Sequence, residues 1–574
     1  MLTEMAFDCA FLQNFELNFK KNRKTQPLCS IAAGRFVSKT GLHSGTWPGI
    51  IGLNHFIPVQ GGATLLYAKI TSLGCFALDG FVVTVEADLS GGLPTFELVG
   101  LPDNAVKEAK DRVRSALKNT GFTYPVSRIT VNLAPADIKK TGPIYDLPVL
   151  LSILAAAGQL PTPAADCAFL GELSLDGAVR SINGVLPMAL AARANGIKAL
   201  FVPADNAAEA AVVEDIAVYG VASVAQLAAH LRGEHELDTT QPQPFTALFA
   251  PAGPDFADVR GQPEARRALE IAAAGHHNAL LIGPPGTGKS MLAKRLPSIL
   301  PPLTREEAIE ITEIYSIAGQ LPRGTGLLHE RPFRSPHHSV STMGLAGGGT
   351  IPRPGEVSLA HNGVLFLDEL PEFRRDALEI LRQPIEDGKV TISRVAASST
   401  FPSRLMLVAA MNPCLCGYFG HPTRACTCTP FAIERYLQRI SGPLLDRIDL
   451  HVEVPPVDYD ALAGAVAGEA SSAILARVTA ARQRQQQRYA AHGISCNAQL
   501  TPKLLRRYCT PTPAADRLLR LAFEKMGLSA RAYDRVLKVS RTIADLDGAE
   551  QIDSAHVSEA IQYRNLDRKY WHSN

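Results

Sequence analysis

A glycine-rich octapeptide near the middle of the chain has the composition of a phosphate-binding loop. It matches the pattern GxxxxGK[ST] at every specified position. Its glycines let backbone N–H groups wrap the phosphates of ATP, and the following helix adds the partial positive charge of its N-terminus. We expect Lys289 to contact the β and γ phosphates and Ser290 to hold Mg²⁺. The predicted nucleotide-binding residues are Gly283, Pro284, Pro285, Gly286, Thr287, Gly288, Lys289 and Ser290.

Two adjacent carboxylates follow an apolar segment further along the chain. The segment Val364-Leu365-Phe366-Leu367 predicts a buried strand that delivers Asp368 and Glu369 to its carboxyl end, where open α/β sheets bind their ligands. We expect Asp368 to bind Mg²⁺ and Glu369 to polarise the attacking water. Acidic residues often end strands, so the pair is informative only because it follows a complete phosphate loop. Together the two motifs predict hydrolysis of ATP.

Three further polar side chains could act on the γ-phosphate. The predicted strand Leu405–Ala409 leads to Asn412, which could contact the γ-phosphate or the water, or simply occupy a turn before Pro413. Phosphoryl transfer also needs positive charge on the γ-phosphate in the transition state. Arg447 and Arg531 are candidates for this role, although spacing alone favours a surface ion pair for either of them.

Four clustered cysteines could bind a metal ion. They form the pattern Cys414-x-Cys416 and Cys426-x-Cys428, with His421 between the two pairs. Four thiolates can hold Zn²⁺ tetrahedrally, but the CxC spacing is less specific than the CxxC spacing of most structural sites. The alternative is a reduced loop without metal. We favour zinc, with the four cysteines as ligands and His421 as a surface residue.

The elements that must position these groups belong to two regions. Between residues 258 and 455, the apolar segment Ala279–Ile282 predicts the strand before the phosphate loop, and Met291–Leu296 predicts the helix after it. Residues 456–574 are predicted to form a helical lid. Helical spacing relates Tyr533, Val536, Leu537, Ser540, Ile543 and Ala544, and Asp553 could cap a closing helix that contains Val557 and Ile561.

Residues 67–235 predict a separate α/β module. Alternating apolar residues indicate half-buried strands at Phe81–Ala87 and Arg128–Ala134. Between these strands, Asp103 could cap a helix that Gly121 ends, because the apolar positions recur at steps of three and four.

Composition is that of a soluble globular protein. The 574 residues include 57 basic and 55 acidic side chains, and the net charge of +2 indicates neither nucleic-acid nor membrane binding. Ten cysteines, four of them clustered, do not suggest a disulfide framework. No apolar run approaches the ~20 residues of a membrane span, and no basic segment marks a secretory signal at the N-terminus. We expect a cytoplasmic protein with no membrane partner.

Four motifs together resemble the magnesium-chelatase-like AAA+ ATPases of the ComM/YifB family. The resemblance covers roughly residues 67 to 570 and implies an AAA+ P-loop α/β domain followed by a helical lid. It also implies a ring, with a homohexamer expected on nucleotide or DNA binding. The motifs are Phe96-Glu97-Leu98-Val99-Gly100-Leu101-Pro102, Asn132-Leu133-Ala134-Pro135-Ala136-Asp137, Phe333-Arg334-Ser335-Pro336-His337-His338 and Met411-Asn412-Pro413-Cys414.

The resemblance assigns roles to the two arginines by motif position. It implies that Arg447 is the arginine finger supplied by a neighbouring subunit and that Arg531 is the sensor in the lid. Arg439 is a weaker candidate for the finger. The family-like sequence begins near residue 65, so we expect residues 1–64 to be a poorly ordered or mis-annotated extension. Residues 239–257, rich in proline and polar side chains, are expected to be a linker.

Residues 67–235 are also similar to the proteolytic domain of Lon proteases, a ribosomal S5 domain 2-like α/β fold. In that family a serine follows Gly-Pro, and a lysine follows a glycine-containing turn. Here Ile144 follows Gly142-Pro143, and Leu186 follows Asn183-Gly184-Val185. A Ser–Lys mechanism needs a hydroxyl and an amine that can lose its proton, and these two side chains supply neither. The resemblance therefore implies a retained fold without peptidase chemistry.

Members of the ComM/YifB family are associated with branch migration of DNA in natural transformation. The resemblance therefore implies a helicase or translocase acting on branched or single-stranded DNA. Residues 386–394 are predicted to form a hairpin turn and strand, from which Lys389 and Arg394 could grip phosphates. The loop His337–Gly349 is a second candidate pore element, and for each the alternative is an ordinary solvated turn. A helix with Arg477, Arg482, Arg484 and Arg488 is expected to be a solvated face rather than a DNA contact.

Two other functions compete with the DNA motor. One is the motor subunit of a magnesium chelatase. It is disfavoured because a Lon-like domain is not expected there and because the chain lacks a D-x-S-x-S metal-adhesion motif. The other is a regulatory ATPase that remodels proteins, which would hydrolyse ATP at a rate independent of DNA.

Overall fold

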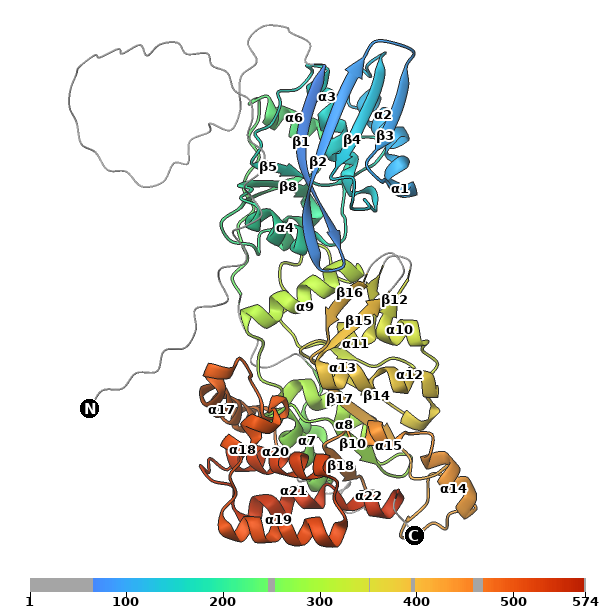
Figure 1. Ribbon diagram of the computed structural model, residues 1–574, viewed down its shortest axis with the longest axis vertical. Helices are drawn as coiled ribbons and strands as arrows, with labels where there is room; N and C mark the ends of the chain where they lie inside the picture. The colour runs from blue at the N-terminus through green and yellow to red at the C-terminus, as the bar shows by residue number, and fades with distance from the viewer. Residues whose placement is uncertain (1–65, 246–252, 350–351, 394–397, 458–467, 572–574) are drawn as a thin grey trace, which may run out of the picture. The chain divides into compact units, whose positions relative to one another are not determined.

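A computed structural model describes residues 66–245, 253–349, 352–393, 398–457 and 468–571 (Figure 1). The expectations for residues 1–64 and for Arg394 lie outside the described residues. Within the described ranges, no helix combines the length and the apolar composition that a membrane span requires.

The N-terminal module is built on a mixed sheet of seven strands in the order β3-β4-β2-β1-β5-β8-β9. β2 pairs antiparallel with β1 and with β4, whereas the other neighbours are parallel. Its strands are β1 (Tyr67–Phe76), β2 (Asp79–Ser90), β3 (Thr95–Val99), β4 (Arg128–Ala134), β5 (Cys167–Phe169), β8 (Ala199–Pro203) and β9 (Ala217–Val221), and β6 (Glu172–Leu173) and β7 (Val179–Arg180) form a separate pair. Its α-helices are α1 (Asn104–Lys107), α2 (Ala109–Asn119), α3 (Asp146–Ala156), α4 (Val185–Ala194), α5 (Ala207–Ala210) and α6 (Val224–Leu231).

The helix predicted between Asp103 and Gly121 is two helices in the structure. Asp103 caps α1, as its side chain accepts a hydrogen bond of 2.8 Å from the backbone N–H of Val106. The α-helical pattern is interrupted at Glu108, where the N–H of Asp111 bonds to the carbonyl three residues back rather than four. The expectation of one continuous helix was therefore wrong.

The second module contains a parallel sheet of five strands in the order β11-β14-β17-β10-β18. The strands are β10 (Ala279–Ile282), β11 (Phe333–Arg334), β14 (Val364–Leu367), β17 (Met406–Met411) and β18 (Leu450–Glu453). All residues of β10, β14 and β17 are buried, as expected for a parallel sheet covered on both faces. The α-helices of this region are α7 (Pro263–Gly275), α8 (Lys289–Arg295), α9 (Arg305–Ala318), α10 (Thr342–Ala346), α11 (Glu356–Leu359), α12 (Arg375–Ile380), α13 (Arg382–Asp387), α14 (Pro430–Leu437) and α15 (Gly442–Leu445).

Two short hairpins are inserted between the strands of this sheet. One pairs β12 (Gly347–Gly348) with β13 (Arg353–Pro354), and the other pairs β15 (Lys389–Ser393) with β16 (Ser398–Pro402). The turn predicted around Glu386–Lys389 was misplaced. Gly388, with a φ of +65°, ends helix α13 there, and the hairpin closes later, between β15 and β16.

The C-terminal region is helical, coloured orange to red in Figure 1. Its longest helices, α17 and α20, pack against α7 of the second module. Arg477 bonds to Glu270 at 2.6 Å and Arg488 bonds to Asp545 at 2.5 Å, so these arginines of α17 join helices, although Arg477 also remains 41% exposed. The helices are α17 (Ser471–Tyr489), α18 (Pro502–Tyr508), α19 (Pro513–Met526), α20 (Ala530–Leu546), α21 (Ser554–Gln562) and α22 (Asn565–Tyr570).

Candidate ATPase site and adjacent cysteine cluster

The phosphate loop connects the end of β10 to the start of α8. A Cβ atom at Gly283 would lie 2.2 Å from the carbonyl oxygen of Val454, so no larger residue fits there. Gly286 and Gly288 have φ angles of +81° and +87°, which L-residues with side chains rarely adopt. The loop therefore needs its glycines both for packing and for backbone conformation.

Lys289 and Asn412 meet above the phosphate loop, although they are far apart in sequence. The Lys289 Nζ donates to the carbonyls of Gly283 and Pro284 at 2.7 and 2.8 Å, and to Asn412 Oδ1 at 3.2 Å. Asn412 directly follows β17, which lies next to β10 in the sheet. Burial lowers the pKa of Lys289 to about 8, against the opposing effect of Asp368 and Glu369.

The pKa of Lys289 predicts a pH dependence for nucleotide binding. The charged amine binds phosphate, and it loses its proton as the pH rises through about 8. We therefore expect the affinity for ATP to fall above that pH, by up to about tenfold per unit, and binding near pH 8.5 to take up protons. Calorimetry in two buffers of different ionisation enthalpy measures the uptake. Equal affinity at pH 7 and pH 9.5 would contradict this prediction.

Ser290 and Asp368 provide the oxygen atoms for a magnesium site. The Ser290 hydroxyl donates to Asp368 Oδ2 at 2.6 Å, which joins the first turn of α8 to the end of β14. Hydroxyl and carboxylate oxygens are ligands that Mg²⁺ prefers, together with phosphate oxygens and water. The two residues are thus adjacent and of suitable chemistry to hold Mg²⁺ beside a bound triphosphate.

Glu369 lies beyond Asp368 in a conformation unusual for its residue type. Its φ is +51°, in the left-handed region, and its side chain is 58% exposed. Its carboxylate lies 3.6 Å from Nδ1 of His338, which follows β11. The sequence places His338 in a family motif and in the candidate pore loop His337–Gly349, but predicts no contact with Glu369. The sequence alone does not place it beside Glu369, because β11, the neighbour of β14, has only two residues.

Arg447 and Arg531 line one cavity of about 490 Å³, which the lid also borders through Arg535 and Lys538. The described residues that line it do not include the phosphate loop, Asp368 or Glu369. Arg447 forms an ion pair with Glu386 and donates to the carbonyls of Arg382 and Pro443 at 3.1 and 2.6 Å. The structure thus brings the two arginines to one cavity whose lining does not include the candidate triphosphate-binding residues of the same chain.

Two other candidate residues, Arg439 and Lys389, differ from Arg447 in their contacts and exposure. Arg439, the weaker candidate for the finger, is paired with Glu372 at 3.0 Å. Lys389 is exposed at the start of β15.

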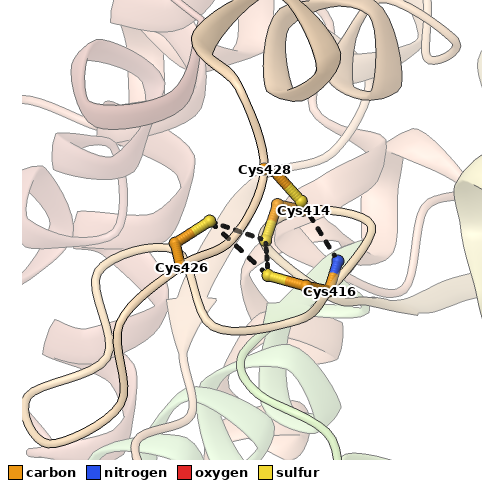
Figure 2. A group of neighbouring side chains, drawn as sticks. All are labelled: Cys414, Cys416, Cys426 and Cys428. Atoms are coloured by element: carbon orange, nitrogen blue, oxygen red, sulfur yellow. Dashed lines mark hydrogen bonds between the residues drawn. The ribbon is translucent and has the colours of Figure 1, made fainter.

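The four clustered cysteines converge on one point, as Figure 2 shows. Their sulfur atoms all lie within 4.8 Å of one another. The separations between Cys414, Cys416 and Cys426 are 3.4, 3.5 and 3.7 Å, close to the ~3.8 Å expected between thiolates bound tetrahedrally at ~2.3 Å from zinc. His421 is not part of the group, and its Nδ1 accepts hydrogen bonds from the backbone N–H groups of Thr423 and Arg424.

The cysteine loop touches the phosphate loop. A Cβ atom at Gly417 would lie 2.5 Å from Cδ of Pro285, so the loops pack without intervening space. The backbone N–H of Phe419 donates to Cys414 Sγ at 3.3 Å, and that of Cys416 donates to Cys428 Sγ at 3.4 Å. Such N–H donors are common around thiolate ligands, so the surroundings also suit a metal.

Ile144 and Leu186 occupy the positions at which the resemblance to Lon proteases would require the catalytic serine and lysine. Both side chains are buried in the core of the N-terminal module. The backbone N–H of Leu186 donates to Glu209 at 2.9 Å, and the Glu209 carboxylate also bonds to Ser316 on α9. Burial raises the pKa of Glu209. This region therefore contributes to a packed contact between the N-terminal module and α9.

Comparison with known proteins matches nearly the whole of the two modules and the lid. Residues 255–462 match the family model described as magnesium chelatase, subunit ChlI. Residues 85–206 match subunit ChlI of Mg-chelatase, and residues 468–564 match the C-terminal part of that subunit. The chain is 45% identical to the protein YifB of Salmonella typhimurium, over 85% of this chain and 95% of the relative. It is 46% identical to competence protein ComM of Haemophilus influenzae, over 87% of this chain and 98% of the relative.

The chain belongs to the magnesium-chelatase-like ComM/YifB family. This confirms the resemblance inferred from the four motifs. Membership implies an AAA+ ATPase that uses ATP and Mg²⁺. A weaker similarity, 27% identity over 201 residues, relates 33% of the chain to 26% of the Lon protease of Mycolicibacterium smegmatis. The predicted fold class, with a Lon-like α/β module, an AAA+ module and a helical lid, is also confirmed.

Proposed function

We propose that the protein is a ring-shaped ATP-driven motor, a homohexamer that acts on branched or single-stranded DNA in homologous recombination. The observation that supports ring assembly is that the candidate catalytic residues lie in two separate places in the chain's structure. Lys289, Ser290, Asp368 and Glu369 lie together, while Arg447 lines a separate cavity. A neighbouring subunit that brings its Arg447 to this ATP would complete the site, which makes assembly a condition for hydrolysis.

We propose DNA as the substrate on two grounds: the name of one relative and the exposed side chains of the β15–β16 hairpin. The relative from Haemophilus influenzae is a competence protein. Among the described strand residues of the hairpin, the exposed side chains are Lys389 and hydroxyl-bearing residues, including Thr391 and Thr400. Lysine and hydroxyl side chains suit contacts to a phosphate backbone without sequence preference. We place such a motor in the cytoplasm, where recombination substrates are found.

The test is ATPase activity and strand displacement with linear duplex, single-stranded and four-way-junction DNA. We expect stimulation of ATP hydrolysis by single-stranded or junction DNA and ATP-dependent processing of the junction. Lys389→Ala should weaken DNA binding and lower its salt dependence by about one counterion per subunit. Thr391→Ser keeps the hydroxyl and serves as the matched control. An active hexamer that ignores all three DNAs would exclude this function.

A magnesium-chelatase motor subunit is the second candidate. The matched family models carry that subunit's name, including the model that covers residues 85–206 of the N-terminal module. This match weakens the argument that such a module is foreign to a chelatase. The second candidate predicts an ATPase that DNA does not stimulate, and a protein-remodelling ATPase makes the same prediction. We propose no peptidase activity, because Ile144 and Leu186 supply neither a nucleophile nor a base.

We further propose that Cys414, Cys416, Cys426 and Cys428 bind one Zn²⁺. The convergence of their sulfur atoms supports the proposal. Purified protein should contain about one zinc per chain by elemental analysis, and Cys428→Ser should lower this content severalfold. Cys75→Ser removes a cysteine of the N-terminal module instead and is the control. Zinc far below one per chain in the unsubstituted protein would exclude the site.

A further inference from the structure

Two large apolar side chains are exposed on the segments that the clustered cysteines bring together. Leu415, between the first two of these cysteines, is 58% exposed, and Phe431, near the start of α14, is 72% exposed. The loop that carries Leu415 packs on the phosphate loop through Gly417 and Pro285. We call Leu415 and Phe431 the apolar pair. Exposed apolar side chains gathered in one place commonly mark a surface that contacts another protein.

The helical lid has a groove of about 650 Å³ between α18, α19 and α20. Pockets of roughly 300–1,000 Å³ hold drug-sized ligands, so the groove can take up two side chains. The rings of Phe523 and Tyr533 meet edge-on in it, with their centroids 6.2 Å apart. Leu505 and Leu537 add further apolar surface to its lining. We call this feature the lid groove.

The lid groove adjoins the cavity that contains Arg447 and Arg531. Helix α20 serves both, because Arg531 lines the cavity and Tyr533 lines the groove. If Arg447 reaches the ATP of a neighbouring subunit, the surface beside that subunit's phosphate loop must approach the lid groove. The apolar pair belongs to this surface. The residues that line both the cavity and the groove are Pro502, Leu505 and Asp534.

The apolar pair and the lid groove of one chain lie apart. Figure 1 shows α14 and α18 on opposite sides of this region, so a chain does not fill its own groove. Two different surfaces on opposite sides of a subunit produce a head-to-tail contact, which closes into a ring when the rotation allows it. Charges of both signs accompany each surface, with Glu434 and Arg435 exposed on α14 and Asp516 and Arg520 in the groove lining.

We propose that the apolar pair of one subunit docks in the lid groove of the next subunit, a second copy of this chain. This inference rests on the ring of the proposed function and names the two surfaces that hold the ring together. An aromatic side chain that enters a pocket of the partner is typical of the residues that dominate the energy of an interface. Because the groove and the arginine cavity share α20, docking also directs Arg447 and Arg531 toward the bound ATP.

Photo-crosslinking of the full-length protein tests this contact directly. Phe431 is replaced by p-benzoylphenylalanine, and unlabelled protein is mixed with protein labelled with heavy nitrogen before assembly with a non-hydrolysable ATP analogue. We expect crosslinks to α18, α19 or α20 in peptide pairs that join a light chain to a heavy one. The same group at Leu93, an exposed residue of the N-terminal module, is the control. Crosslinks from position 431 of the ring that reach only other surfaces, or only the same chain, would overturn the inference.

Variants measure how much the contact contributes to assembly. Phe431→Asp and Phe523→Asp should each raise the concentration at which rings form by about tenfold or more, because each places a charge in an apolar contact. Leu521→Asp introduces the same charge on α19 and is the matched control, since Leu521 is exposed and is not among the described residues that line the groove. Mass photometry over a range of protein concentrations measures assembly.

Two checks separate this inference from misfolding and from the proposed function. Thermal unfolding of each variant should match the original protein, and Phe431→Asp, at a more exposed position, tests the contact if Phe523→Asp does not fold. If the unsubstituted protein forms no ring, the proposed ring and this inference fail together. If rings form and DNA stimulates their ATPase, but Phe431→Asp assembles at the original concentration, only this inference is overturned.

Discussion

Glu369→Gln is expected to bind ATP with nearly unchanged affinity and to hydrolyse it at least about a hundredfold more slowly. The amide has the size of the carboxylate but cannot accept a proton from the attacking water. Glu369 is exposed beyond Asp368 and takes no part in the Ser290–Asp368 hydrogen bond. Its loss should therefore leave the magnesium-binding oxygens and the phosphate loop intact. Equilibrium binding of a fluorescent ATP analogue and steady-state phosphate release measure the two effects.

The companion variant Lys289→Ala should lose binding as well as turnover. Its amine bridges the phosphate loop and Asn412, and it is the cation that the phosphates would meet first. The control for Glu369→Gln is Asp376→Asn, which removes the same negative charge from an exposed carboxylate of α12 that is paired with Arg374. Turnover at the normal rate in either Glu369→Gln or Lys289→Ala would show that the catalytic site has been placed wrongly.

The parts of the site that the sequence predicts are those next to fully buried strands. Every residue of β10 and β14 is apolar, so the points where Ser290 and Asp368 leave the sheet are visible in the sequence. Their contact at 2.6 Å then follows from parallel pairing through β17. The same logic could have reached His338. However, β11 has only two residues, which is too short to show any periodicity.

Other features depend on packing that local sequence does not encode. Asp387-Gly388 is a common hairpin turn, but a glycine in the left-handed region ends a helix equally well, and here it ends α13. The arginines of α17 have the spacing of a solvated face, yet Arg477 and Arg488 bond to α7 and α20. The shared cavity of Arg447 and Arg531 depends on where the lid packs, which no motif specifies.

Arg447→Ala is expected to lower ATP hydrolysis about a thousandfold while leaving ATP binding largely intact. The guanidinium would stabilise charge on the γ-phosphate of a neighbouring subunit, so its loss raises the transition-state energy rather than that of bound ATP. In the single chain it is held by Glu386 and two backbone carbonyls, so unfolding must be monitored in parallel. Arg374→Ala removes an exposed arginine that is paired with Asp376 at 2.9 Å and is the matched control.

Mixing two inactive variants tests whether Arg447 acts on the ATP of a neighbouring subunit or on the ATP of its own chain. Glu369→Gln subunits retain Arg447, and Arg447→Ala subunits retain the residues around Lys289. In a randomly mixed ring, half of the subunits offer an intact nucleotide site and half of their neighbours offer an arginine, so about a quarter of the interfaces should be active. Equal mixing should therefore restore about a quarter of the original ATPase activity, measured after co-assembly with ATP. If mixed rings form but stay inactive, Arg447 does not act across the subunit interface.

The mixture can be repeated with Arg531→Ala in place of Arg447→Ala. Because Arg531 lines the same cavity as Arg447, we expect the mixed rings to recover activity in the same way.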